Sequence, residues 1–290
     1  MTRAEVQPSS IPDLMIRTAV RTALAEDLGR AGDITTNSIV APDISFAGTV
    51  RAREEGRIAG IDLAVAAFRE VDGGVDIQVA NDDGSDVEAG DAVLVIEGHA
   101  RGVLTAERTA LNFLGHLSGV ATATRNLVEV VRGTRAQICC TRKTTPGLRA
   151  LEKYAVRIGG GVNHRFGLDD AVLIKDNHLA VAGGIASAVK AARAGIGHMV
   201  KIEVEVDTLE ELEEALAAGV ETILLDNMAP DRLRQAVERN AGRAVLEASG
   251  GITLESVRAV AETGVDFISV GWITHSAPCL DLGLDQGARA

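Results

Sequence analysis

The amino-acid sequence predicts an α/β protein with two domains, an N-terminal α+β sandwich followed by a parallel α/β barrel. Three observations lead to this prediction. The chain has 290 residues, a length that suits one barrel with a smaller domain. Strand-like and helical segments mix without regular order over roughly residues 1–105, which is typical of an α+β domain. After residue 200, strand-like and helical segments alternate regularly, which is typical of a parallel sheet.

The first domain is expected to contain two helices and three strands. Apolar residues at helical spacing predict a helix from Leu14 that stops at Gly29, and a second helix over residues 61–71. Between and after them, three short runs with strand character are separated by glycine and aspartate turns: residues 46–52, 75–79 and 92–96. We place this domain at residues 1–105, and the C-terminal tail, residues 276–290, could pack on it.

The second domain, residues 106–275, begins with a long helical segment that opens at Thr105 and is expected to break near Ser118 and Gly119. Its last four strand-like runs read VKIEVEV, TILLD, AVLEASG and DFISVG. The polar or glycine residues that end them are 21, 23 and 22 positions apart, which is one per βα unit: Glu205, Asp226, Ser249 and Gly271. Parallel strands end at the same rim of a barrel, so these four are expected together at its C-terminal rim.

The segment from Thr141 to His178 concentrates positive charge in an acidic protein. It holds seven lysine or arginine residues against four acidic ones, whereas the whole chain has a net charge of −12. Solubility alone would spread such charges, so their grouping beside three consecutive glycines favours a pocket for a small, strongly anionic ligand. The alternative is a solvated basic helix face. We favour that alternative for Arg149, Lys153 and Arg157, which share one face of an expected helix.

Two strand-like runs within this segment each end in basic side chains. Arg142 and Lys143 follow the run AQICCT, and Lys175 follows the run AVLI. A lysine at the end of an apolar strand is costly unless it is paired or functional. The glycine triplet leads into His164 and Arg165, which sets an imidazole and a planar guanidinium beside permissive backbone. This combination is suited to binding a carboxylate or a phosphate.

Carboxylates are expected to face the interior of the barrel. In the run KIEVEVD, Glu203 and Glu205 alternate with apolar residues, and helices cover the outside of a barrel. Buried carboxylates need cations, a metal or ligand hydroxyls, and Asp226 repeats the arrangement one strand later. The alternative is a structural ion pair with Lys201 or Lys175.

Composition excludes several classes of protein. Aromatic residues make up 2% of an acidic chain, which leaves little for stacking on bases or for contacting a nucleic-acid backbone. No apolar run approaches the roughly 18 residues of a membrane span, and the first residues lack the apolar core of a signal peptide. We therefore expect a cytoplasmic protein with a small-molecule partner, no nucleic acid and no membrane. The cysteines at positions 139, 140 and 279 are expected to be buried thiols.

Three motifs in this order resemble those of the quinolinate phosphoribosyltransferase family: TRKTTPGLR, GGGVNHRFGLDD and LIKDNH. The resemblance extends over nearly the whole chain, from AEDLGRAGDITT near the start to SVGWITHS near the end. It implies an enzyme that transfers the phosphoribosyl group of phosphoribosyl pyrophosphate to quinolinate with loss of CO₂, giving nicotinate mononucleotide for NAD biosynthesis. It also implies that the barrel is incomplete, of the seven-stranded type.

The resemblance implies roles for the residues at matching positions. Those that surround the dicarboxylate would be Arg108, Arg142, Lys143, His164, Arg165 and Lys175, and Thr141 would also bind substrate. Those that take the 5′-phosphate, largely through backbone N–H groups, would be Ser249, Gly250, Gly251, Val270, Gly271 and Trp272. Glu205 and Asp226 would bind ribose hydroxyls or Mg²⁺, a cation that favours one or two carboxylates. The catalytic roles would fall to Lys143, Glu205 and Asp226.

The implied reaction needs no protein nucleophile. The pyridine nitrogen attacks C1 of the ribose as pyrophosphate leaves, and catalysis consists of orientation and electrostatic stabilisation. By sequence alone, Arg108 is a surface residue on the polar side of a helix. In the family, an arginine in a matching ERTALN motif reaches the active site of the neighbouring subunit. The resemblance therefore implies a homo-oligomer, at least a dimer, in which Arg108 completes the neighbour's site.

One residue departs from the family pattern. A small residue usually follows the glycine in the family, as in GALTHS, whereas Trp272 follows Gly271 here. The bulky ring is expected either to narrow the phosphate site or to turn outward.

Three other functions fit parts of the sequence. A paralogue of the same family, such as the molybdenum-associated relatives, would share the motifs and use another substrate. A Schiff-base aldolase would use Lys175 as its nucleophile, which requires a neutral amine. A non-catalytic nucleotide-binding or regulatory barrel is disfavoured by the number of ionisable residues at the rim.

Overall fold

The computed structural model describes residues 10–287 and divides the chain into two compact units. The first unit comprises the chain through Arg125, residues 145–160 and the chain from Ser276 onward, and the second comprises residues 126–144 and 161–275. The boundary suggested by the sequence, between residues 105 and 106, falls inside helix α4 (Ala100–Val131). The N-terminal segment, in which no signal peptide was expected, lies mostly outside the described residues.

The first unit is built on an antiparallel sheet with strand order β12, β1, β5, β3. These strands are β1 (Ser45–Ala52), β3 (Asp76–Val79), β5 (Ala92–His99) and β12 (Leu282–Gln286). β12 pairs with β1, so the C-terminal tail supplies an edge strand to this sheet. A second, two-stranded sheet consists of β2 (Gly56–Arg57) and β4 (Asp86–Val87).

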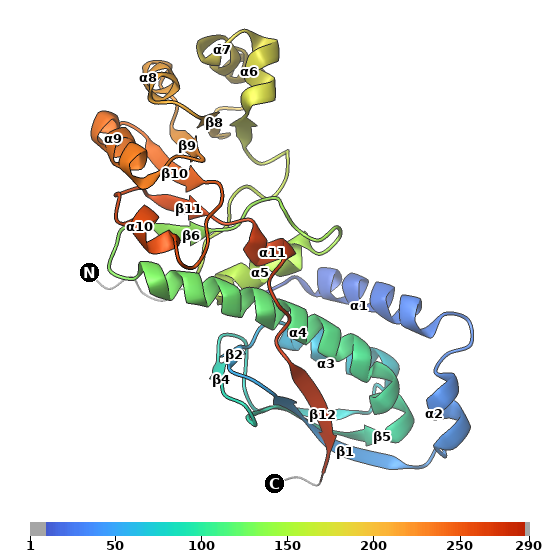
Figure 1. The fold of residues 1–290 in the computed structure, drawn as a ribbon. Helices are drawn as coiled ribbons and strands as arrows, with labels where there is room; N and C mark the ends of the chain where they lie inside the picture. The colour runs from blue at the N-terminus through green and yellow to red at the C-terminus, as the bar shows by residue number, and fades with distance from the viewer. Residues whose placement is uncertain (1–9, 288–290) are drawn as a thin grey trace. The chain divides into compact units, whose positions relative to one another are not determined.

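Helices form the rest of the first unit: α1 (Asp13–Leu28), α2 (Ile34–Ile39), α3 (Ile61–Val71), α4 and α5 (Arg149–Ile158). Figure 1 shows α3 and α4 beside the four-stranded sheet. Apolar side chains from these three parts meet in a core in which Leu63, Phe68, Ile96 and Leu117 are at most 1% exposed. Burial of such side chains is the main favourable contribution to folding.

Helix α4 is continuous, so the predicted break near Ser118 and Gly119 is wrong. The N–H of Ala59 donates a hydrogen bond to the Ser118 hydroxyl at 3.0 Å. A Cβ atom added at Gly119 would lie 2.0 Å from the carbonyl oxygen of Pro278. Glycine at this position therefore permits a close approach of the chain to an unbroken helix.

The second unit is built on a parallel sheet with strand order β6, β11, β10, β9, β8, β7. Its strands are β6 (Gln137–Cys139), β7 (Val172–Ile174), β8 (Ile202–Val206), β9 (Thr222–Asp226), β10 (Val245–Ser249) and β11 (Phe267–Ser269). Its helices are α6 (Asp176–Ala182), α7 (Ile185–Gly195), α8 (Leu209–Ala217), α9 (Pro230–Asn240), α10 (Val257–Ala261) and α11 (Trp272–His275). Figure 1 shows α7, α8 and α9 side by side along the sheet.

The predicted mixed α/β fold, with a small N-terminal sheet and a parallel C-terminal one, is confirmed. The parallel sheet has six strands and stays open among the residues described here. An isolated parallel bridge joins Cys139 to Val162 beside the edge strand β6. This bridge marks the position at which a seventh strand of the predicted incomplete barrel would pair.

Local signals in the sequence explain where several helices begin. Thr208 and Glu211 cap α8 reciprocally, each side chain accepting a hydrogen bond from the other's backbone N–H. Pro230 begins α9. Within residues 10–287, no helix is both long enough and apolar enough to cross a membrane.

Two expectations about burial are wrong. Lys153 is 2% exposed rather than part of a solvated face, whereas Arg149 and Arg157 are half-buried. Cys139 and Cys140 are buried thiols, but Cys279 is exposed. Side-chain type alone does not reveal which turn of an amphipathic helix lies under neighbouring chain.

Candidate active site

A pocket of about 490 Å³ opens at the carboxyl ends of the parallel strands in the second unit. Residues that are far apart in the sequence meet there, because parallel strands all end at this edge. Apart from Val270, Gly271 and Trp272, every residue of this unit that was assigned to the site lines the pocket: Thr141, Arg142, Lys143, His164, Arg165, Lys175, Glu205, Asp226, Ser249, Gly250 and Gly251.

Two arginines make one part of this pocket suited to anions. Arg165 donates one hydrogen bond from Nη1 to the carbonyl oxygen of Ala171 at 2.9 Å. The Nε atoms of Arg142 and Arg165 are buried and have no hydrogen-bond partner. Burial, followed by the positive charge of Arg142, lowers the pKa of Arg165 from its usual value. Two neighbouring guanidinium groups with unused buried donors are stabilised by an anion that accepts from both.

Carboxylates lie at the ends of the adjacent strands β8 and β9. Glu205 forms an ion pair with Lys175, with 2.5 Å between Oε2 and Nζ. This is one of the two pairings considered as a structural alternative for Glu205. The side-chain amide of Asn227 donates to Asp226 Oδ2 at 2.6 Å. Both carboxylates therefore face the pocket while each keeps one neighbouring donor.

A glycine-rich loop follows strand β10. Gly250 and Gly251 have φ angles of +95° and +61°, which side chains other than glycine rarely adopt. A Cβ atom added at Gly250 would lie 2.1 Å from Oδ1 of Asn227. The backbone N–H of Asn227 also donates to the carbonyl oxygen of Ser249 at 2.9 Å. The loop is thus held tightly against the end of β9, with its backbone at the pocket wall.

The three remaining predicted residues of this unit support the pocket from one side. The backbone N–H of Val270 donates to the carbonyl oxygen of Cys139 at 2.9 Å. Gly271 lies against Lys143, since a Cβ there would be 2.8 Å from Lys143 Cδ. The indole N–H of Trp272 donates to the carbonyl oxygen of Ile252 at 3.0 Å. The ring is therefore fastened to the end of the glycine-rich loop.

Several pocket residues were not singled out from the sequence as site residues: Leu173, Leu224, Asn227, Glu247 and Ser269. Four of them could have been found by alternation along a strand. Each precedes a predicted strand-end site residue by two positions and so shares its face: Leu173, Leu224, Glu247 and Ser269. The positive φ of Asn227 (52°) is more common for asparagine than for other side chains, but one asparagine alone does not predict it.

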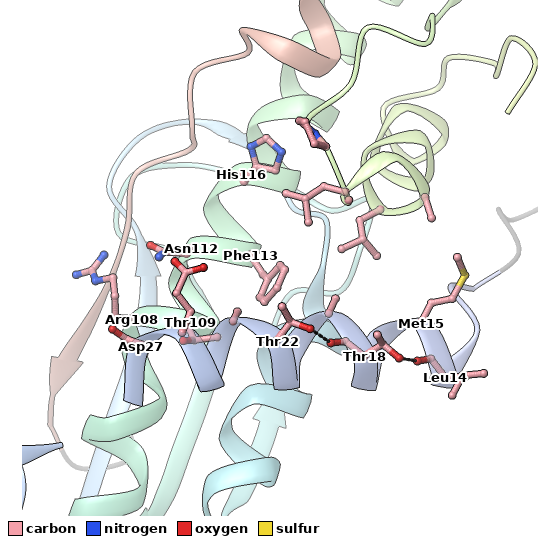
Figure 2. A pocket seen from close by; sticks show the side chains of 18 residues that line it. Leu14, Met15, Thr18, Thr22, Asp27, Arg108, Thr109, Asn112, Phe113 and His116 are labelled. Atoms are coloured by element: carbon pink, nitrogen blue, oxygen red, sulfur yellow. Dashed lines mark hydrogen bonds between the residues drawn. The ribbon is translucent and has the colours of Figure 1, made fainter. Parts of the chain in front are cut away.

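Arg108 belongs to the first unit and lines a different pocket, of about 830 Å³. This pocket lies among α1, α4 and residues 146–151. Figure 2 shows Arg108 projecting from α4, on which Asn112, Phe113 and His116 also lie, with Thr18 and Thr22 of α1 across the pocket. The Arg108 side chain is exposed, as expected from the polar side of its helix.

Two family models match the chain. The N-terminal domain model of quinolinate phosphoribosyl transferase matches residues 33–118, and the C-terminal domain model matches residues 120–285. The chain belongs to the quinolinate phosphoribosyl transferase family. The family motifs TRKTTPGLR, GGGVNHRFGLDD and LIKDNH contribute seven lining residues to the pocket of the second unit: Thr141, Arg142, Lys143, His164, Arg165, Leu173 and Lys175.

Relatives in this family are similar over nearly the whole chain. The nicotinate-nucleotide pyrophosphorylase (carboxylating) of Mycobacterium leprae is 48% identical over 274 residues, covering 93% of this chain and 96% of that protein. A probable enzyme of the same name from Bacillus subtilis is 46% identical over 260 residues, covering 90% and 89%. The structure of the nicotinate-nucleotide pyrophosphorylase from Francisella tularensis has a TM-score of 0.92 at 42% identity, covering 98% and 100%.

Proposed function

We propose that this protein transfers the phosphoribosyl group of phosphoribosyl pyrophosphate to quinolinate with decarboxylation. The products are nicotinate mononucleotide, pyrophosphate and CO₂, and the reaction belongs to NAD biosynthesis. The observation that carries the proposal is the pocket of the second unit, which combines cations, two carboxylates and a glycine-rich loop. The names of relatives that are 46–48% identical to this chain support the same reaction.

The cationic part of the pocket would bind quinolinate. Arg142 and Arg165 have buried N–H donors without partners, and a dicarboxylate supplies the acceptors that they lack. Thr141, Lys143 and His164 line the same pocket and would complete the site. Holding both carboxylates fixes the pyridine ring and so aims its nitrogen at C1 of the ribose.

Another part of the pocket, at the glycine-rich loop, would bind the phosphoribosyl group. Backbone N–H groups at Ser249, Gly250 and Gly251 would take the 5′-phosphate, with Val270 and Gly271 supporting them from the next strand. The loop is already ordered against Asn227 and Trp272. An ordered loop loses little conformational entropy on binding, which favours phosphate affinity.

Glu205 and Asp226 fit a magnesium ion by their chemistry. They are carboxylates at the ends of neighbouring strands, and Mg²⁺ usually takes one or two such ligands together with phosphate oxygens and water. When bound, the ion would neutralise charge on the departing pyrophosphate. Lys175 would then release Glu205 and turn to the anionic substrates. Alternatively, these two carboxylates could accept hydrogen bonds from the ribose hydroxyls.

Transfer would then proceed without a protein nucleophile. The ring nitrogen forms its bond to C1 while the bond from C1 to pyrophosphate breaks, and pyrophosphate leaves with the electron pair. Lys143 and Lys175 stabilise the negative charge that develops. The aldolase alternative needs a neutral Lys175, whereas the ion pair with Glu205 stabilises its ammonium form.

We also propose that the protein is at least a homodimer in which Arg108 completes the site of a neighbouring subunit. Arg108 is exposed at a pocket of the first unit that also has exposed apolar lining residues, Leu14 and Met15. An exposed apolar surface of this kind is typical of contact between protein chains. The cytoplasmic location stays a prediction, since relatives from plants are named mitochondrial or chloroplastic.

An assay of the purified protein tests the proposed reaction. Quinolinate labelled in its 2-carboxyl group is supplied with phosphoribosyl pyrophosphate and Mg²⁺, and labelled CO₂ is collected. Release that requires all three components, and that a chelator abolishes, is the expected result. Nicotinate in place of quinolinate should give no pyrophosphate. A folded protein that releases no CO₂ would instead favour a paralogue acting on another substrate.

A further inference from the structure

Three ionisable side chains meet in the interior of the second unit, next to the proposed substrate pocket: His164, Glu203 and Glu247. His164 Nε2 lies 2.8 Å from Glu203 Oε2 and 3.8 Å from Glu247 Oε1. The two glutamates are 8% and 4% exposed. One oxygen of each carboxyl group, Oε1, is buried without a hydrogen-bond partner. Such groups are costly unless charge or protons are arranged to compensate.

The spacing of these groups would allow a metal ion, but the protons of His164 argue against one. Their potential ligand atoms all lie within 4.8 Å of one another. The backbone N–H of Arg165 donates to His164 Nδ1 at 2.8 Å, so Nδ1 is an acceptor. The neutral ring must then carry its proton on Nε2, the atom that faces both carboxyl groups. A protonated nitrogen cannot bind a metal, so this tautomer favours a proton site over a metal site.

The same geometry indicates which of the two glutamates is the protonated, neutral one. Glu203 accepts the His164 Nε2–H, which stabilises a negative charge on Glu203. Burial, followed by the charge of Glu203, raises the pKa of Glu247 to about 7. A positive charge on His164 opposes this rise most, followed by hydrogen bonds from Ser269 and Cys139. The acceptor role of His164 Nδ1 favours the neutral ring, which lacks that charge.

We propose that Glu247 acts as a neutral carboxylic acid in the wall of the substrate pocket and donates the proton that replaces the lost carboxylate. This inference rests on the proposed decarboxylating reaction. When the bond from ring carbon C2 to the carboxylate breaks, its electron pair stays on C2. The O–H bond of Glu247 then breaks and its proton forms the new C–H bond. Glu247 becomes a carboxylate and regains one proton from water in each turnover.

Other groups that line the pocket are less suited to this step. The arginines and lysines must keep their protons to hold anionic substrates. The hydroxyls of Thr141, Ser249 and Ser269 are weak acids. A carboxyl group that titrates near neutral pH has the driving force to donate a proton and can be reprotonated afterwards. Among the described lining residues, Glu247 is the carboxyl group whose pKa is raised in this way.

The variant Glu247→Gln tests the proposal, because glutamine has nearly the same size and is neutral but has no acidic proton. Glu238→Gln is the matched control, since Glu238 is exposed on α9. We expect kcat to fall at least tenfold in Glu247→Gln, while KM for both substrates changes less than about threefold. Glu238→Gln should match the wild type. A Glu247→Gln enzyme with kcat within twofold of the wild type would overturn the proposal.

The pH profile separates proton donation from a structural role. The donor must be protonated, so wild-type kcat should fall tenfold per pH unit above the pKa of Glu247, near 7. Glu247→Gln should lose this alkaline limb. The titratable groups that face Glu247 are His164, Glu203 on β8 and Cys139 on β6. Burial raises the pKa of the Cys139 thiol well above its usual value, so the thiol stays neutral over this range.

A measurement without turnover distinguishes failure of this inference from failure of the proposed reaction. The infrared spectrum of the wild type should contain a protonated-carboxyl band that titrates near pH 7. The band should be absent from Glu247→Gln and present in Glu238→Gln. If the band is found but no CO₂ is released, the proposed reaction is wrong. If CO₂ is released and the wild type has no such band at pH 6, Glu247 is not the donor.

Discussion

The guanidinium of Arg165 is held by one hydrogen bond, from Nη1 to the carbonyl oxygen of Ala171, while its Nε has no hydrogen-bond partner. Lysine would keep the charge but not the planar set of donors. We therefore predict that Arg165→Lys raises KM for quinolinate at least tenfold. This increase corresponds to the loss of one charge-assisted hydrogen bond, which contributes roughly 1.5–3 kcal/mol to the binding free energy. KM for phosphoribosyl pyrophosphate should change less than about threefold. Initial rates measured against each substrate in turn check both values.

The matched control for this prediction is Arg232→Lys, because Arg232 is exposed on α9. It should leave both KM values unchanged. Equal increases for the two substrates in Arg165→Lys would indicate a general disturbance of the pocket and contradict a specific contact with quinolinate.

Individual site residues could be predicted when they end a strand. Lys175, Glu205 and Asp226 follow apolar runs, and the alternation of side chains along β8 correctly placed Glu203 in the interior. The role of Glu247 could not be predicted, because its raised pKa depends on burial and on the charge of Glu203, which comes from another strand. Tertiary proximity, not local sequence, determines that protonation state.

At the scale of elements, the loop after β10 is the part of the site with the least tolerance for change. We predict that Gly250→Ala raises KM for phosphoribosyl pyrophosphate at least tenfold, because the added methyl group would meet Asn227 and displace the loop. Gly242→Ala is the matched control. Gly242 also has a positive φ, +77°, but has open space around it.

Comparison of the two glycine variants separates backbone strain from collision. A left-handed alanine should cost each variant about 1–2 kcal/mol of stability, and Gly250→Ala should lose more because of its collision with Asn227; thermal melting measures both losses. Only Gly250→Ala should lose affinity for phosphoribosyl pyrophosphate. If Gly242→Ala loses as much affinity, the position of the loop does not explain the effect.

Elements with a strong local pattern agreed with prediction. Helix α3 has the predicted bounds, α1 ends at the predicted glycine, and β1 and β9 differ by at most one residue from the apolar runs. The predicted break in α4 was wrong, because Gly119 instead allows a close tertiary contact with Pro278. A glycine inside a helix gives the same local signal whether it breaks the helix or admits a neighbouring chain.

At the scale of the whole molecule, the proposed dimer makes a test by mixing subunits possible. We predict that Arg108→Ala and Lys143→Ala are each nearly inactive alone. Mixed and allowed to exchange subunits, they should recover about a quarter of wild-type activity, because half of the dimers would be hybrids with one intact site. Activity that stays absent after verified exchange would place Arg108 and Lys143 in the same subunit's site or outside it.

Long-range architecture was predictable only in part. The regular spacing of strand ends indicated the parallel sheet, because one βα unit repeats. The pairing of β12 with β1 joins the two ends of the chain, and no local pattern predicts its register. The Cys139–Val162 bridge is likewise too short to leave a periodic signal.

Trp272 is the only tryptophan of the chain, and its indole N–H is bonded to the end of the glycine-rich loop. The protein therefore contains a single indole fluorophore, at the place where phosphate is proposed to bind. Its emission reports on that loop without any label and without background from a second indole. The residue that departs from the family pattern thus lets ligand binding be followed optically, apart from catalysis.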